Sequence, residues 1–145
     1  MSDLYDRVFM NKKYSPFDKI KIAWVGDWLK KNQFKKILDV GCGRGHYLKA
    51  FEEHKITGLE PSKYLCEGDL LHLPDILNGG LPYVTYRYWD ALYCMDVLEH
   101  ILPHQLNEAI TSLSKLAPTA LLGIANHSDV WHGVELHLIQ EDEGW

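Results

Sequence analysis

Four residues near position 40 and one further along the chain have the types and spacing needed to hold a nucleoside. Asp39 is followed by Gly41, Gly43 and Gly45, and glycine lets a backbone bend sharply while leaving space for a ligand to lie against it. Glu60 lies about 20 residues beyond Asp39, the spacing at which dinucleotide-binding folds set a carboxylate against ribose hydroxyls. A carboxylate only accepts hydrogen bonds, which suits hydroxyl donors. The pattern predicts a site for an adenosine-type ligand.

The glycine spacing differs from the nicotinamide fingerprint. That fingerprint places its third glycine at position 46, where this chain has His46, and here the third glycine comes one residue early. Without a pyrophosphate to hold at the start of the helix, the turn better suits a nucleoside with a short amino-acid tail. A nicotinamide-dependent oxidoreductase is therefore the disfavoured alternative.

Alternating strands and helices are expected to position these residues. Each predicted strand is a short apolar run, and Glu60-Pro61 ends one of them because proline cannot donate to a strand ladder. The alternation predicts an α/β fold with a mostly parallel sheet and helices on both faces. Strands are expected at residues 36–40, 56–59, 89–95 and 119–125, and helices at 46–54 and 106–116.

We expect one domain over residues 1–145, because 145 residues with 46% hydrophobic composition supply one core. Residues 1–35 are predicted to be a helical segment covering a core at 36–126. Its helix is expected to start at Ser15-Pro16, with one apolar face. That face comprises Ile20, Trp24, Val25, Trp28 and Leu29.

The charge and composition of the chain limit the classes of partner that it is expected to bind. Residues 1–36 carry 9 Lys/Arg against 4 Asp/Glu, whereas 37–145 carry 6 against 16, so bulk nucleic-acid binding is not expected from the acidic body. No run approaches the roughly 20 apolar residues of a membrane span, and the start lacks the features of a secretory signal. A cytoplasmic location without membrane association is the resulting expectation.

Four motifs in order resemble those of class I S-adenosylmethionine-dependent methyltransferases: Ile37–Gly45, Ile56–Ser62, Glu67–Asp69 and Asp90–Ile101. The resemblance implies a three-layer Rossmann-like fold that binds S-adenosylmethionine. It also implies contacts to each part of that cofactor. These are Asp39 and the loop Gly41, Cys42, Gly43 and Gly45 at the methionine tail, Glu60 and Pro61 at the ribose, Asp69 and Leu70 at the adenine, and Cys94, Met95 and Asp96 at the methionine end.

The chain departs from this pattern in two places. Only six residues separate Ser62 from Asp69, although a parallel crossover needs about a dozen. The sheet is thus expected to be shortened after its second strand, with a missing or vestigial helix. At the carboxyl end, residues 127–145 look incomplete, and the alternation from Val134 to Leu138 predicts either a strand on a bare sheet edge or a lid.

The resemblance implies methyl transfer to a small molecule or sugar, since the Asn/Asp-Pro-Pro-Tyr motif of base-methylating enzymes is missing. His127 and His100 are the candidate bases for a hydroxyl acceptor. A noncatalytic module that binds S-adenosylmethionine or S-adenosylhomocysteine is the alternative. Metal ligands are also present, but their spacing is not diagnostic, so no metal site is predicted. They are Asp96, Glu99 and His100 with His127, His132 or His137.

Overall fold

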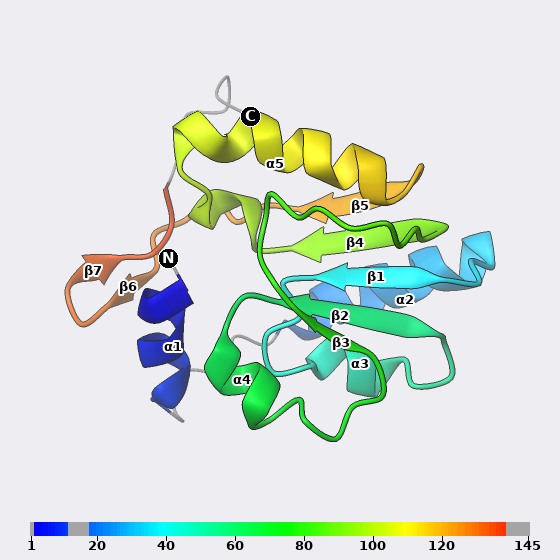
Figure 1. Cartoon of the computed structure of the whole chain (residues 1–145), viewed down its shortest axis with the longest axis horizontal. Helices are drawn as coiled ribbons and strands as arrows, with labels where there is room; N and C mark the ends of the chain where they lie inside the picture. Colours follow the sequence, from blue (N-terminus) through cyan, green and yellow to red (C-terminus); the bar gives the residue numbers. More distant parts are fainter. Residues whose placement is uncertain (1, 12–17, 139–145) are drawn as a thin grey trace.

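The computed structural model describes residues 2–11 and 18–138, and within them a five-stranded parallel sheet in the order β3-β2-β1-β4-β5 (Figure 1). The strands are β1 (Ile37–Val40), β2 (Ile56–Glu60), β3 (Ile76–Asn78), β4 (Ala91–Met95) and β5 (Ala120–Gly123). The helices are α1 (Ser2–Met10), α2 (Lys19–Asn32), α3 (His46–Ala50), α4 (Lys63–Glu67), the 3-10 turn η1 (Leu98–His100) and α5 (Pro103–Leu116). The predicted α/β class with a parallel sheet is confirmed.

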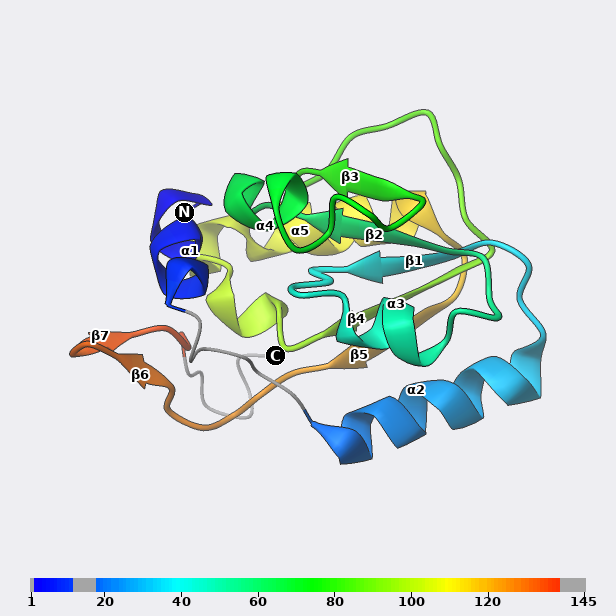
Figure 2. The ribbon, with the colours of Figure 1, turned by 90° about the horizontal axis from the view of Figure 1, so that it is seen from below.

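The two faces of the sheet are covered by different helices, which makes three layers (Figure 2). Alternation along each strand sends Leu38 and Val40 of β1 into a core with α5, while Ile37 enters a core with α2 and α3. Strand β4 divides in the same way, with Cys94 on the α5 side and Tyr93 on the other. The central strands are buried throughout, as continuous apolar runs predict.

Helix α2 contacts the core through a narrower stripe than its sequence indicated. It begins after Asp18, whose carboxylate accepts a hydrogen bond from the amide of Ile20 at 2.8 Å. Val25 and Leu29 are buried, but Ile20 is 62% exposed and Trp24 58% exposed, so the expected five-residue apolar face is wrong for those two. The expected start at Ser15-Pro16 lies outside the described residues.

The crossover after β2 has the vestigial helix that was predicted, but the connection itself is not shortened, because it runs over residues 61–75 to a β3 that starts at Ile76. Helix α4 has five residues, and α3 also ends at Ala50, earlier than the expected 46–54. Strand β3 begins at Ile76 and has three residues, too few to form a clear apolar run in the sequence. It pairs with β2 and completes that side of the sheet.

The carboxyl-terminal segment forms a hairpin. Strands β6 (Val130–Trp131) and β7 (Val134–Glu135) pair only with each other in the described chain, so of the two alternatives for this segment, a strand on the sheet edge or a lid, the edge strand is wrong. In Figure 1 the hairpin and α1 stand on the side where the strands end. None of the described helices is both long and apolar enough to span a membrane.

Candidate functional site

A cavity of about 590 Å³ opens where the strands end, within the range of small-molecule sites. The strand order reverses between β1 and β4, the position at which open parallel sheets bind ligands. Residues at or just beyond the end of every strand of the sheet contribute to its lining. They are Val40 and Gly41 for β1, Glu60 and Pro61 for β2, Gly79, Gly80 and Leu81 for β3, Met95 and Asp96 for β4, and Ala125 for β5.

Glu60 fixes the glycine loop in place. Its Oε2 accepts a hydrogen bond from the amide of Gly43 at 2.8 Å, and its Oε1 accepts from the amide of Ser62 at 2.8 Å. The amide of Gly41 donates to the carbonyl of Leu59 at 2.7 Å. The predicted loop and the predicted carboxylate therefore meet directly at one wall of the cavity.

The three glycines of the loop all have positive φ, but they serve different neighbours. A side chain at Gly41 would overlap Val97, and one at Gly45 would meet Leu73 at 2.9 Å. At Gly43, with φ +52°, a Cβ would meet no protein atom within 4 Å. Gly43 is thus the one whose missing side chain leaves open space in the cavity wall.

Asp39 presents an unsatisfied acceptor beside the loop. The residue is 3% exposed, and neither its Oδ2 nor the hydroxyl of the nearby Tyr93 has a hydrogen bond to any described residue. Burial raises the pKa of Asp39 to about 8; the nearby Tyr93 hydroxyl lowers it and the charge of Glu60 raises it. Burial also raises the pKa of Glu60 to about 7, against the lowering effect of the Ser62 and Gly43 amides. A further hydrogen-bond donor or a positive charge near these two buried carboxylates would therefore stabilise their ionised forms.

Helix α1 closes one side of the cavity. Asp6 accepts a hydrogen bond from the hydroxyl of Ser62 at 2.5 Å, which fastens α1 to the start of α4. Arg44, in the glycine loop, donates to the carbonyl of Phe9 at 2.7 Å. Tyr5 and Phe9 line the cavity as a result.

The opposite wall carries a cation and an anion from segments far apart in the chain. Lys21 of α2 pairs with Asp96 after β4, at 2.5 Å between Nζ and Oδ1. Asp96 has φ +55°, a left-handed conformation that non-glycine residues seldom adopt. The strained residue lies in the cavity lining, where such conformations commonly serve function.

Three histidines line the remaining wall. Nδ1 of His100 lies 2.7 Å from the carbonyl oxygen of Leu136, and Nδ1 of His137 lies 2.6 Å from that of His127. The ring centroids of His100 and His137 are 4.8 Å apart. Burial lowers the pKa of His100 and favours its neutral form. His100 and His127, the predicted catalytic residues, thus share the cavity with His137.

Comparison with known proteins decides the family. Residues 11–140 match the family described as methyltransferase domain. This chain belongs to that family. Its fold and motifs are those of the class I, Rossmann-like methyltransferases.

Among curated relatives of the methyltransferase domain, the ubiquinone biosynthesis O-methyltransferase of Vibrio atlanticus is 34% identical over 94 residues, covering 57% of this chain and 38% of the relative. The corresponding enzyme of Chromobacterium violaceum is 32% identical over 97 residues, which cover 56% of this chain and 40% of the relative. The matches span about two-fifths of these relatives.

Solved structures share the fold. The SAM-bound aminopentose methyltransferase CalS10 of Micromonospora echinaspora superposes with a TM-score of 0.65 at 19% identity, covering 84% of this chain and 56% of its own. DesVI of Streptomyces venezuelae superposes with a TM-score of 0.65 at 20% identity, and the match covers 90% of this chain and 61% of DesVI. The predicted Rossmann-like architecture is confirmed by these likenesses.

Four residues predicted for the cofactor site of the methyltransferase domain do not line the cavity. Gly45 is the first, and a side chain there would meet Leu73 and Leu70. Asp69 pairs instead with Arg44, and Leu70 is fully buried in the core. Both lie in the turn before β3, which starts only at Ile76. Cys94 is fully buried on the α5 face of β4, and its neighbours Met95 and Asp96 reach the cavity.

Sequence reasoning also missed several lining residues of the methyltransferase domain. Gly79 and Gly80 could have been found, because the turn signal Asn78-Gly79-Gly80 follows the apolar pair Ile76-Leu77. Lys21 had no such signal, since only packing of α2 brings it to the cavity.

Proposed function

We propose that this chain binds S-adenosylmethionine in the cavity and transfers its methyl group to a hydroxyl of a small-molecule acceptor, sugars included. The observation that carries the proposal is the contact between Glu60 and Gly43. It places a buried carboxylate, a loop with open space at Gly43 and an unsatisfied Asp39 oxygen along one wall.

The chain's residues fit the parts of this cofactor. The unpaired Oδ2 of Asp39 suits the amino group of the methionine part, and Glu60 retains lone pairs for ribose hydroxyls. The backbone at Met95 and Asp96 would hold the methionine end. Gly79 and Gly80, just after β3, line the cavity and would lie beside the base, the role expected of Asp69.

When bound, S-adenosylmethionine supplies a methyl group on a positively charged sulfur that leaves as a neutral thioether. Alignment by the protein is then the main contribution, worth about 7–11 kcal/mol by comparison with intramolecular reactions. A hydroxyl acceptor must also lose its proton as the new carbon–oxygen bond forms. His127 lines the cavity and is the proposed base.

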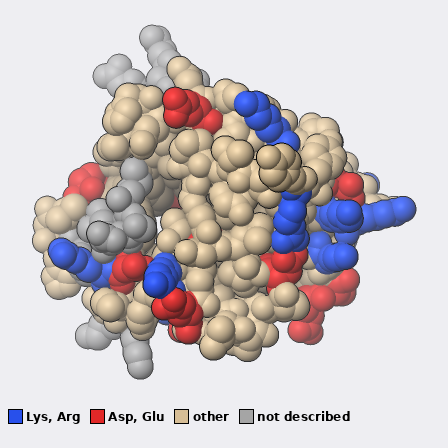
Figure 3. Space-filling model, viewed as in Figure 1, with Lys and Arg blue, Asp and Glu red and all other residues tan. Residues whose placement is uncertain are grey.

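Two kinds of observation support a small acceptor. The named relatives are O-methyltransferases of ubiquinone biosynthesis, and structural neighbours include a sugar N-methyltransferase from Streptoalloteichus. Figure 3 shows acidic and basic side chains interspersed on the face viewed, where a polyanionic acceptor would favour a continuous basic surface.

Calorimetry and turnover together test the proposal. The parent chain should bind S-adenosylmethionine and S-adenosylhomocysteine, and should form the latter with some member of a panel of phenols and sugars. His127→Ala should retain cofactor affinity within about twofold and lose at least tenfold in turnover, because removing a base acts on the chemical step. His72→Ala, at an exposed position outside the cavity, is the matched control.

The same measurements separate the noncatalytic alternative. A module that only binds would give the calorimetric signal and no S-adenosylhomocysteine with any acceptor. No binding of either ligand would remove both interpretations.

A further inference from the structure

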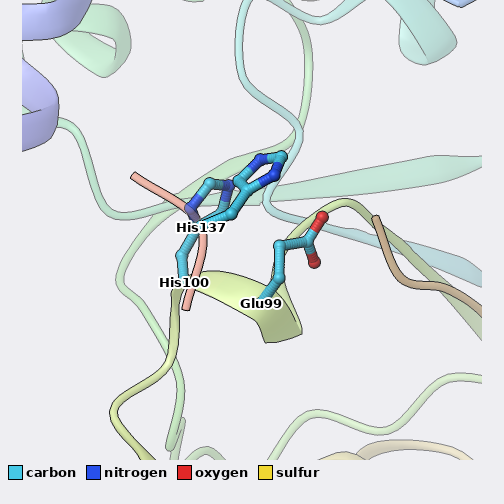
Figure 4. A group of neighbouring side chains, drawn as sticks. All are labelled: Glu99, His100 and His137. Carbon is cyan, nitrogen blue, oxygen red and sulfur yellow. The ribbon is translucent and has the colours of Figure 1, made fainter. Parts of the chain in front are cut away.

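We propose that Glu99, His100 and His137 form a binding site for a divalent transition-metal cation at the edge of the cofactor cavity. Each residue offers one ligand atom, and these atoms all lie within 4.8 Å of one another. Figure 4 shows the two imidazoles side by side with the Glu99 carboxylate next to them. The motif spacing had predicted no metal site, and the three-dimensional arrangement revises that expectation.

The hydrogen bonds of the two histidines use Nδ1 of each ring and leave Nε2 for a cation; Nε2 of His137 also lies 3.8 Å from Oδ2 of Asp129, beyond hydrogen-bond distance. The carbonyl oxygens of Leu136 and His127 can only accept, so Nδ1 of His100 and Nδ1 of His137 must each carry the proton. In a neutral imidazole, Nε2 then keeps its lone pair. Metal-binding histidines in proteins are oriented in this way, with the second ring nitrogen donating to a backbone carbonyl or carboxylate.

Glu99 supplies a buried carboxylate oxygen without a partner. The residue is fully buried, and its Oε1 accepts a hydrogen bond from the amide of Ala125 at 3.0 Å. Its Oε2 is buried without a hydrogen bond to any described residue. An uncompensated buried carboxylate is costly, and a bound cation would supply both a partner and the opposite charge.

A link between distant segments of the chain holds the cluster together. The amide of Leu138 donates to the carbonyl of Glu99 at 2.6 Å, which fastens the segment after β7 onto η1. His137 is the residue just before that contact, and it is only 6% exposed. The site thus exists only when the hairpin segment is docked, which explains why sequence spacing did not reveal it.

The ligand set indicates the class of cation. Two imidazoles and one carboxylate favour Zn²⁺, Fe²⁺ or Co²⁺ over Mg²⁺, which prefers oxygen ligands. Ligands around tetrahedral Zn²⁺ lie about 3.4 Å apart, from metal–ligand distances of about 2.1 Å, so side-chain rotation must close part of the present separation. Three protein ligands leave further coordination positions open, as in catalytic zinc sites.

A cation held by this cluster would lie at the edge of the cavity proposed for the acceptor. His100 and His137 line the same cavity as the glycine loop, and a cation there would bind the acceptor hydroxyl and make its proton easier to remove. This step, unlike cation binding itself, rests on the proposed function. His100 then serves as a ligand, and His127 remains the proposed base.

Metal titrations of the chelator-treated full chain test the site without any methyl acceptor. Calorimetry with Zn²⁺ should show one tight site per chain that Mg²⁺ does not fill, and Co²⁺ should give the visible absorption of an ordered nitrogen- and oxygen-ligated ion. His137→Ala and Glu99→Gln should weaken Zn²⁺ binding at least tenfold. Glu99→Gln can still accept the hydrogen bond from Ala125, and His72→Ala controls for loss of an exposed histidine.

Affinity for S-adenosylhomocysteine in each variant reports whether the fold is intact, since the glycine loop lies on the other wall. Loss of the tight Zn²⁺ site in both cluster variants, with His72→Ala unchanged, supports the proposal. Zn²⁺ binding that is equal in parent and cluster variants overturns it, whatever the turnover. A chain that binds Zn²⁺ at this cluster yet methylates nothing leaves the cation site standing and removes the proposed function.

Discussion

Two of the walls of the cavity, the glycine-loop wall and the histidine wall, are built in opposite ways. The glycine-loop half, made of Asp39, Gly41–Gly45 and Glu60, comes from the ends of two adjacent parallel strands, and backbone amides hold it together. The histidine half, made of η1 and residues 127–138, is assembled by single hydrogen bonds between η1 and the hairpin segment. One wall is thus part of the sheet, and the other is docked onto it.

Because of this difference, we expect the glycine-loop half to be rigid and the histidine half to be adaptable. Strand ends in a buried sheet open only with the whole core, whereas segments held by a few contacts open at lower free energy. A methyl donor of constant chemistry suits the first kind of wall, and an acceptor that varies among relatives suits the second. We therefore expect changes in the glycine-loop half to act on cofactor binding and changes in the histidine half to act on turnover or metal binding.

The largest expected effect is from Gly43→Val. A branched side chain would fill the open space at Gly43 and would also strain its positive φ. We predict at least a 100-fold loss of S-adenosylhomocysteine affinity by calorimetry. Gly133→Val is a matched control, because Gly133 has φ +80° and equally open surroundings but lies in the β6–β7 hairpin turn.

The control separates backbone strain from loss of ligand space. If both valine variants lose affinity equally, strain alone explains the result and the comparison between the two walls fails. If Gly43→Val binds like the parent, the ligand does not lie against this loop.

Glu60→Gln should have the next largest effect. Both carboxylate oxygens accept from backbone amides, so an amide side chain must turn its NH₂ group toward the amide of Gly43 or of Ser62. One unpaired buried donor costs about 1–3 kcal/mol, so cofactor affinity should fall about 10- to 100-fold. Glu67→Gln, which removes an exposed ion pair with Lys63, should change it less than about twofold. Equal affinities in the two variants would remove Glu60 from the site.

The buried carboxylates predict a pH dependence. Because the pKa of Asp39 is raised to about 8 and that of Glu60 to about 7, the free domain holds protons that its unfolded chain releases near pH 4. Stability of the free domain should therefore fall as pH rises from about 4 to 8. The positive amino group and hydroxyls of the cofactor favour the ionised forms, so its binding should release protons.

Calorimetry in buffers of different ionisation enthalpy measures that proton release directly. Affinity should rise with pH between about 6 and 8, by at most about tenfold per unit for each carboxylate. Asp39→Asn should flatten part of the profile. A pH-independent affinity in the parent would show that neither carboxylate changes its ionisation on binding.

The fold was predictable where a single segment carried its own signal. Strands β1, β2 and β4 are apolar runs, the first two of which end at a glycine or a proline, and their parallel direction follows from the crossovers between them. Strand β3 was not predictable from hydrophobicity, because it has three residues and only partial burial. The exposed Ile20 and Trp24 on α2 show that apolar spacing does not fix how much of a helix the core covers.

The site residues, like the strands, were predictable only where a local sequence pattern determined their position. Glu60 and Gly43 meet because strand ends in neighbouring parallel strands meet, so sequence spacing was sufficient. Asp69, whose position was counted from a motif and not from a strand end, lies outside the cavity and pairs with Arg44. The pairing of His137 with η1 depends on where the hairpin docks, which no local pattern encodes.

The smallest expected effect tests whether α1 belongs to the glycine-loop half. Asp6 accepts hydrogen bonds from the hydroxyl of Ser62 at 2.5 Å and from the amide of Tyr64 at 3.2 Å, which fastens α1 over the cavity. Asp6→Ala should cost about 1 kcal/mol of docking and lower cofactor affinity about fivefold, with faster hydrogen exchange in α1 and unchanged exchange in α5. Asp27→Ala, exposed on α2, is the control. Faster exchange in α1 without any loss of affinity would mean that the helix covers the cavity and contributes nothing to holding the cofactor, leaving the strand-end wall to bind it alone.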